Sequence, residues 1–151
     1  MNPISSQIRI GTIGELLVAL RLLQYGVQAA PPIKDSGNDL IAVKGEAFRA
    51  IQVKTTQSEC FQLNNLPGLY HIVALVHLVG EDQSIYLDQS DVFLLEKKQI
   101  TANRYRIEDL NDSKMNETLV ERLFTSDGAP CEPVRAPAGI AAQQLVRPEH
   151  R

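Results

Sequence analysis

An acidic residue and a lysine-containing tripeptide stand close together in the N-terminal half of this 151-residue chain. Asp39 precedes the apolar residues 40–43, and Gln52-Val53-Lys54 ends a second β-branched segment. Side chains alternate between the two faces of a strand, so Gln52 and Lys54 point to the same side. Carboxylate and amide oxygens bind hard divalent cations, and a lysine stabilises charge that develops on a phosphate. These residue types predict a metal-dependent hydrolysis site.

The intervening residues predict the β-hairpin that brings these groups together. Residues 39–44 and 47–54 have the composition of strands, and Gly45-Glu46 between them is typical of a tight reversal. In register, the hairpin places Asp39 near the polar side chains of the second strand. The main-chain carbonyl of Val53 is then a further candidate metal ligand.

Glu15 is the fourth candidate side chain, within a predicted helix over residues 4–26. This helix is apolar on nearly all sides, which predicts packing on more than one side. A carboxylate in such a segment is costly unless it is paired or bound to a cation. Gly14 before it allows another backbone to approach closely. Glu15 is therefore a candidate metal ligand; the alternative is that it lies at a solvated edge of the helix.

The rest of the chain predicts an α/β fold, in which the N-terminal helix precedes a mixed sheet of four to five strands flanked by helices. The continuous apolar run of residues 70–79 predicts a buried central strand. The other predicted elements are strands at 27–33, 84–87 and 105–107, a loop at 55–69, and helices at 88–98 and 112–124.

A change of composition near residue 126 divides the chain. Residues 1–125 fit one domain with a single core. The last 26 residues hold four of the eight prolines and five alanines, which cannot build a core alone. Residues 126–151 are therefore expected to form a Pro/Ala-rich arm, docked on its own domain or on a neighbouring subunit, or a tail.

Charge and composition exclude several classes of protein. Residues 1–60 hold six Lys/Arg against five Asp/Glu, whereas residues 61–151 hold nine against thirteen. The net charge of −3 excludes a protein that coats nucleic acid by charge alone. Aromatic residues make up 5% of the chain, so few platforms for base stacking are expected. No apolar run has the length of a membrane span and no signal segment is evident, so a cytoplasmic location is expected.

The cysteines and histidines give weaker signals. Cys60 and Cys131 stand far apart without metal-type spacing, which argues against a zinc site. His71 and His77 share a face of the predicted central strand and lack a partner at ligand spacing. Buried, hydrogen-bonded histidines are therefore expected.

The order of these residues resembles the PD-(D/E)XK nuclease superfamily. The matching segments are Gly14-Glu15 in the helix, Gly37-Asn38-Asp39-Leu40-Ile41 in the first strand and Ile51-Gln52-Val53-Lys54-Thr55 in the second, within residues 8–79. The Gln-Val-Lys-Thr version is most similar to the homing endonucleases of group I introns, and archaeal-type Holliday-junction resolvases share the layout. Asn38 stands where the motif usually has proline, and Gln52 replaces the commoner Asp or Glu.

The resemblance implies a restriction-endonuclease-like core and a Mg²⁺-dependent endodeoxyribonuclease, with Mn²⁺ as a possible substitute. Its metal ligands would be Glu15, Asp39 and Gln52, with the Val53 carbonyl, and Lys54 would act in catalysis. The implied substrate is double-stranded or branched DNA, cut by a homo-oligomer in which two sites meet one duplex.

Two other interpretations stay open at this point. The neutral Gln52 weakens the metal site, which is consistent with a weak or inactive nuclease-fold module that binds DNA or a protein partner. In addition, the acidic residues 80–151 are consistent with an interaction protein built on that half. The alternatives without a function are a turn acid at Asp39, an edge amide at Gln52 and a solvated strand-end lysine at Lys54.

Overall fold

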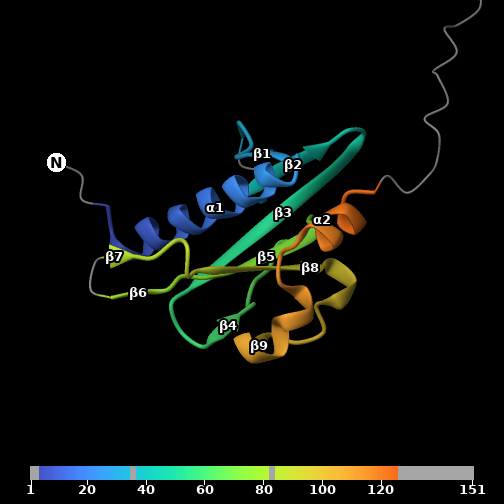
Figure 1. Ribbon diagram of the computed structural model, residues 1–151. Coiled ribbons are helices and arrows are strands. Elements are labelled where there is room, and N and C mark those ends of the chain that lie inside the picture. The colour runs from blue at the N-terminus through green and yellow to red at the C-terminus, as the bar shows by residue number, and fades with distance from the viewer. Residues whose placement is uncertain (1–3, 35–36, 82–83, 126–151) are drawn as a thin grey trace, which may run out of the picture.

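The computed structural model describes residues 4–34, 37–81 and 84–125 (Figure 1). Its elements are α1 (Ser6–Gln24), β1 (Gln28–Ala30), β2 (Leu40–Lys44), β3 (Ala47–Thr56), β4 (Cys60–Gln62), β5 (Ile72–His77), β6 (Gly80–Glu81), β7 (Ser84–Ile85), β8 (Asp91–Glu96), the 3₁₀ helix η1 (Lys97–Gln99), β9 (Arg104–Arg106), the 3₁₀ helix η2 (Ile107–Ser113) and α2 (Glu117–Leu123). The predicted arm at 126–151 lies outside the described residues. Within these ranges no helix is both long enough and apolar enough to cross a membrane.

The strands form a mixed five-stranded sheet in the order β1-β2-β3-β5-β8. β1, β2 and β3 are antiparallel neighbours, β5 runs parallel to β3, and β8 runs antiparallel to β5. The predicted α/β class, with an N-terminal helix before a mixed sheet, is confirmed. Two parallel neighbours need a long crossover connection. Residues 57–71 make this connection and contain β4, which pairs with β9 in a separate two-stranded sheet.

The two faces of the sheet are covered differently. One face packs against α1 and α2 in a large apolar core that includes Leu17, Val18, Leu22, Ile51, Val53, Leu119 and Val120. On the other face, a smaller core around Phe61, Val73, Leu75, Phe93 and Leu95 covers the β5–β8 half. The same face of β2 and β3 is less covered, so the opposed pair Val43 and Phe48 is 41% and 50% exposed. This second face therefore leaves side chains of the hairpin accessible.

Helix α1, predicted over residues 4–26, spans Ser6–Gln24. The Ser5 hydroxyl accepts a hydrogen bond from the backbone N–H of Ile8 at 3.3 Å, which caps the first turn. Gly26 has a φ of +75°, the left-handed conformation that stops a helix. Gly14 contacts the sheet directly, because a Cβ atom there would clash with Oγ1 of Thr55. The missing side chain lets α1 lie against the end of β3.

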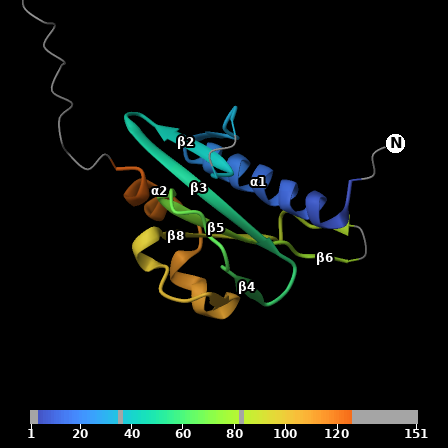
Figure 2. The ribbon, with the colours of Figure 1, turned by 180° about the vertical axis from the view of Figure 1, so that it is seen from behind.

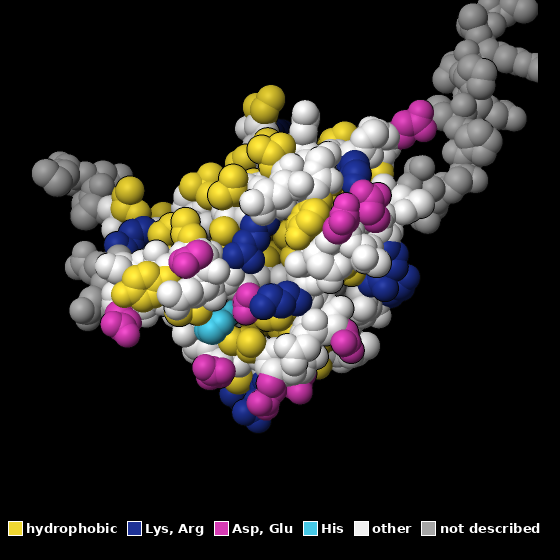
Figure 3. All heavy atoms as spheres, viewed as in Figure 1, with side chains coloured by type: hydrophobic (Ala, Val, Ile, Leu, Met, Phe, Trp, Pro, Cys, Tyr) yellow, Lys and Arg dark blue, Asp and Glu magenta, His cyan; other side chains and the backbone are white. Residues whose placement is uncertain are grey.

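The opposite side of α1 departs from the prediction. Leu16, Leu20 and Leu23 are 63%, 56% and 58% exposed, although the apolar pattern predicts packing on more than one side. Apolar side chains accordingly gather on the surface along α1 in Figure 3. Among the described residues, only one side of this helix is packed into a core.

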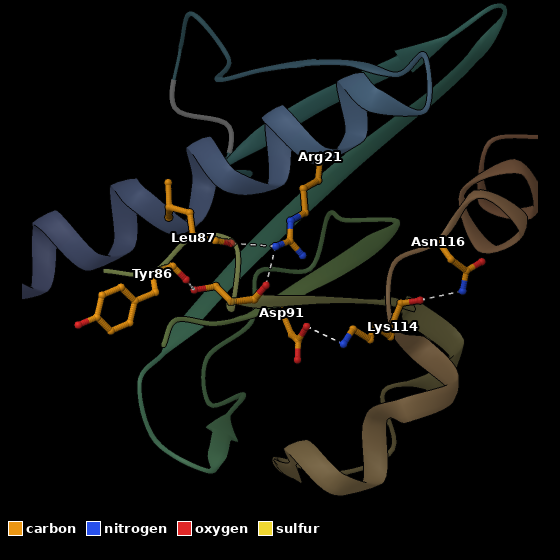
Figure 4. A network of polar contacts seen from close by, with 7 residues as sticks. Arg21, Tyr86, Leu87, Asp91, Lys114 and Asn116 are labelled. Carbon is orange, nitrogen blue, oxygen red and sulfur yellow. Dashed lines mark hydrogen bonds and ion pairs between the residues drawn. The ribbon is translucent and has the colours of Figure 1, made fainter. Parts of the chain in front are cut away.

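A polar network connects the C-terminal half of α1 to the segment just before β8 (Figure 4). The Arg21 guanidinium donates to the carbonyls of Leu87, at 3.0 Å, and Ser90, at 2.5 Å. Nearby, Lys114 forms an ion pair of 2.7 Å with Asp91 at the start of β8. The position of α1 over the sheet is thus set by polar contacts as well as by its apolar face.

Three sequence predictions are wrong in detail. Residues 88–98 form β8 and η1 rather than a helix, because Val92 and Leu94 face one core while Phe93 and Leu95 face the other. The predicted loop at 55–69 contains β4, and the predicted helix at 112–124 is only the seven-residue α2.

Candidate catalytic and metal-binding site

The candidate site lies where β3 extends past its neighbour β2. The ladder between them begins with the pair Leu40 and Ile51, so residues 52–56 have no β2 partner, while β5 pairs with them on the other side. Figure 2 shows β3 crossing the molecule with β2 beside only one end of it. We call this open edge of β3, residues 52–56, the notch.

Asp39 lies at the entrance to the notch. Its backbone N–H donates to the Ile51 carbonyl at 3.1 Å, one step before β2 starts. Its carboxylate Oδ2 accepts hydrogen bonds from the Val53 backbone N–H, at 2.7 Å, and from Nε2 of Gln52. The N–H and C=O of a strand residue point to the same side, so the Val53 carbonyl also faces the notch.

The side-chain oxygen of Gln52 indicates whether these residues can hold a cation. Its side chain is only 8% exposed, and its Nε2 is used by Asp39. Its Oε1 is buried without a hydrogen-bond partner among the described residues. A buried acceptor left unsatisfied costs about 1–3 kcal/mol. An amide oxygen is a ligand for Mg²⁺ or Ca²⁺, so the residues present fit a hard divalent cation.

Glu15 approaches the notch from the α1 side of the sheet. Contact between Gly14 and Thr55 brings this turn of α1 onto the end of β3, and Glu15, Val53 and Lys54 line one cleft of about 330 Å³. Burial raises the pKa of the Glu15 carboxyl, and the negative charge of Asp39 raises it further. The two carboxylates therefore repel each other, and a bound divalent cation would offset this repulsion.

The candidate metal ligands are not all acidic side chains. Across 4–34, 37–81 and 84–125, no three His, Cys, Asp or Glu side chains gather in a metal-binding group. The candidate site has two carboxylates, and Gln52 supplies the third side chain.

Lys54 shares a face with Gln52 and lines a second, larger cleft of about 590 Å³. The hydroxyl residues Thr56 and Ser58 and the cation Arg104 also line this cleft. In the described part of the chain, no ion pair engages the Lys54 ammonium. Among the residues that the structure describes, Glu59 is the one acid that lines this cleft, so its two cations outnumber it, and they and the hydroxyl groups can bind the oxygens of a phosphate.

The structure brings together the five residues that the sequence singles out: Glu15, Asp39, Gln52, Val53 and Lys54. Sequence reasoning missed Arg104, which reaches the cleft because β9 pairs with β4. The sequence predicts a strand at 105–107, close to β9, but it does not predict β4 or the pairing of the two strands. The histidines lie elsewhere: His71 is hydrogen-bonded, as expected, but it is exposed because it precedes β5.

Comparison with known proteins bears on the fold. Among solved structures, a bacterial homing endonuclease, I-Ssp6803I, is similar to this chain, with a TM-score of 0.51 and 16% sequence identity. The likeness covers 68% of this chain and 75% of that one. No protein-family model and no curated protein matches the sequence. At this identity the likeness shows the fold alone, which is a nuclease-like α/β core.

Proposed function

We propose that this chain is a metal-dependent DNA endonuclease of the PD-(D/E)XK type, with its catalytic site at the notch. The observation that carries the proposal is the buried, unsatisfied Oε1 of Gln52 between Asp39 and the end of β3. The raised pKa of Glu15 supports it, because the molecule holds two carboxylates near each other at a cost. The fold likeness to a homing endonuclease supports it independently.

Each residue has a distinct part in the proposed site. Asp39, Gln52, the Val53 carbonyl and Glu15 would hold Mg²⁺, or Mn²⁺ in its place. A bound Mg²⁺ supplies charge that stabilises a phosphoryl oxygen and activates water. Lys54 stabilises the negative charge that develops on the phosphate. Arg104 in the adjoining cleft positions the DNA backbone by its charge.

The proposal includes self-association through the exposed face of α1. Leu16, Leu20 and Leu23 are exposed and follow the three-and-four spacing of helices that pack in pairs. None of these side chains is charged, so the same stripe on a second copy is complementary to it. A dimer brings two sites to one double-stranded or branched DNA.

The oligomer is tested separately from catalysis. Analytical ultracentrifugation of the full chain should give a dimer or higher oligomer, and Leu20→Glu should give a monomer. Thr118→Glu, at an exposed position of α2, is the matched control and should leave the mass unchanged. A wild-type monomer at all concentrations removes the self-association.

Cleavage is tested by nicking of supercoiled plasmid with Mg²⁺, with Mn²⁺ and with a chelator. Asp39→Ala and Lys54→Ala should each lower the rate by about 100-fold or more. Lys114→Ala, which removes an exposed lysine away from the notch, is the control. Circular dichroism checks that each variant folds. Unchanged nicking in both site variants would remove the site assignment.

The neutral Gln52 favours a second candidate, a nuclease-fold module that binds DNA or a protein without cutting. Calorimetric titration separates the two proposals. Uptake of Mn²⁺ by the wild-type chain, lost in Asp39→Ala, supports the endonuclease. Absence of uptake together with retained DNA binding supports the module.

A further inference from the structure

A third hollow, a pocket of about 340 Å³, lies beside the notch on the less covered face of β2 and β3. We call it the hairpin pocket. Its lining residues are mostly apolar or aromatic: Asn38, Ile41, Phe48, Ala50, Gly68, Leu69, Tyr70, His71 and Lys97. The proposed metal chemistry uses none of them.

The walls of the hairpin pocket are aromatic. The His71 ring meets Phe48 edge to face, with 6.0 Å between centroids and 89° between planes. Phe48 is half-exposed, so part of its ring stays accessible. Tyr70 contributes a second ring, with the Lys97 ammonium 5.0 Å from its centroid. The low aromatic content of the sequence suggests few stacking platforms, but the fold concentrates two rings and an imidazole here.

The pocket also offers a donor and an acceptor. Nδ1 of His71 accepts a hydrogen bond from the Ala50 backbone N–H at 2.9 Å. A neutral His71 therefore carries its proton on Nε2, which is a donor. Oδ1 of Asn38 is a buried acceptor without a hydrogen-bond partner among the residues that the structure describes. Stacking surfaces with a donor and an acceptor suit the face and edge of a nucleobase.

Lys97 is a cation that lines the same pocket. It donates to the Gly68 carbonyl. In residues 4–34, 37–81 and 84–125, no acid pairs with its ammonium. Its charge is thus available to the phosphate next to a bound base.

The pocket and the notch are one nucleotide apart. Ala50, in the pocket, and Gln52, in the notch, are successive residues on one face of β3, about 7 Å apart along the strand. Asn38 in the pocket also directly precedes Asp39 in the site. A DNA strand whose phosphate lies in the notch can therefore reach the pocket with a neighbouring base.

We propose that the hairpin pocket holds an unstacked base of the DNA strand whose backbone lies in the notch. This inference rests on the proposed function and names its substrate class, which is DNA with an unpaired base next to the cleavage point. Extruding a paired base costs a few kcal/mol, so an already unpaired base is preferred.

The test measures binding without a divalent metal, so that it does not depend on cleavage. Fluorescence anisotropy compares two duplexes of one sequence, fully paired and with a single unpaired adenine. Wild type should bind the second about tenfold more tightly, as expected for one stacked base. Phe48→Ala should abolish the preference, whereas Tyr86→Ala, at another partly exposed aromatic residue, should retain it.

A second measurement reads out stacking in the wild-type chain itself. With 2-aminopurine at the unpaired position, binding should quench the fluorescence; unchanged or increased fluorescence overturns the pocket. Equal affinity for the two duplexes, or a preference that survives in Phe48→Ala, also overturns it. Competition by free dAMP as strong as that by the oligonucleotide makes the pocket a mononucleotide site and overturns the proposal. Failure of wild type to bind either duplex instead overturns the proposed endonuclease.

Discussion

The two ends of the β2–β3 hairpin carry similar residue types in opposite arrangements. At the turn end, Lys44 forms an ion pair with Glu121, which connects the hairpin to α2. At the notch, Lys54 has no ion-pair partner in the described residues, while Glu15 and Asp39 repel each other. The turn end thus uses its charges for stability. The notch leaves them unbalanced, which lowers stability and is typical of a functional site.

The largest effect is expected where α1 meets the notch. Gly14→Ala drives a methyl group into Thr55, so unfolding should become easier by about 3 kcal/mol. Nicking should also fall, because Glu15 moves away. Gly11→Ala is the matched control: apart from its chain neighbours and its own helix backbone, no atom of the described residues lies within 4 Å of its Cβ position, and the helix should gain about 0.5–1 kcal/mol. Denaturant unfolding measures both, and equal effects would contradict the contact.

Gln52→Glu sharpens the comparison by adding a charge to the notch. A third carboxylate should raise the affinity for Mn²⁺ by about tenfold and lower the stability of the metal-free chain. Calorimetry and thermal unfolding measure the two changes. Gln62→Glu, at an exposed position in the adjoining cleft, is the control. An unchanged metal affinity in Gln52→Glu would place the cation elsewhere.

Lys44→Ala tests the turn end. The ion pair with Glu121 is partly solvated, so its loss should cost about 0.5–1 kcal/mol of unfolding free energy. Nicking should stay within about twofold of wild type, because Lys44 lies at the turn end of the hairpin and not at the notch, where the phosphate is proposed to bind. Lys54→Ala should show the reverse pattern. If both variants lose activity equally, the two ends do not differ in function.

Glu15→Gln should give the smallest change in the unfolding free energy of the metal-free chain. The folded pKa of Glu15 lies above its ordinary value of 4.5, so the native state holds this proton more tightly. Stability is therefore lost as the pH rises from 4.5 through the folded pKa. The metal-free variant should be more stable than wild type by about 0.5 kcal/mol at pH 7, since water screens a partly exposed group. The difference should vanish below pH 4.5 in urea titrations.

The sequence predicts the hairpin and α1 because local signals define them. Gly45 has a φ of +58° in the turn between β2 and β3, and Ser5 caps α1. The relation of Asp39 to Gln52 follows from this register alone. These local signals therefore predict that Asp39 lies close to Gln52.

The missed features depend on pairing between distant segments. β8 has no alternating pattern because both its faces are buried, so periodicity cannot tell it from a helix. Arg104 reaches the cleft only through the pairing of β9 with β4, and the sequence predicts neither β4 nor this pairing. The hairpin pocket likewise joins residues of β2 and β3 to residues 68–71 and Lys97.

The approach of Gly14 to Thr55 has a thermodynamic consequence. Glu15 belongs to α1, whereas Asp39 and Gln52 belong to the hairpin, so a cation held by all three would bridge the helix and the sheet. Detachment of α1 would then require release of the ion. An increase in metal concentration would then raise the melting temperature of the chain by mass action. Detachment of α1 from the sheet would become rarer as more notches hold an ion.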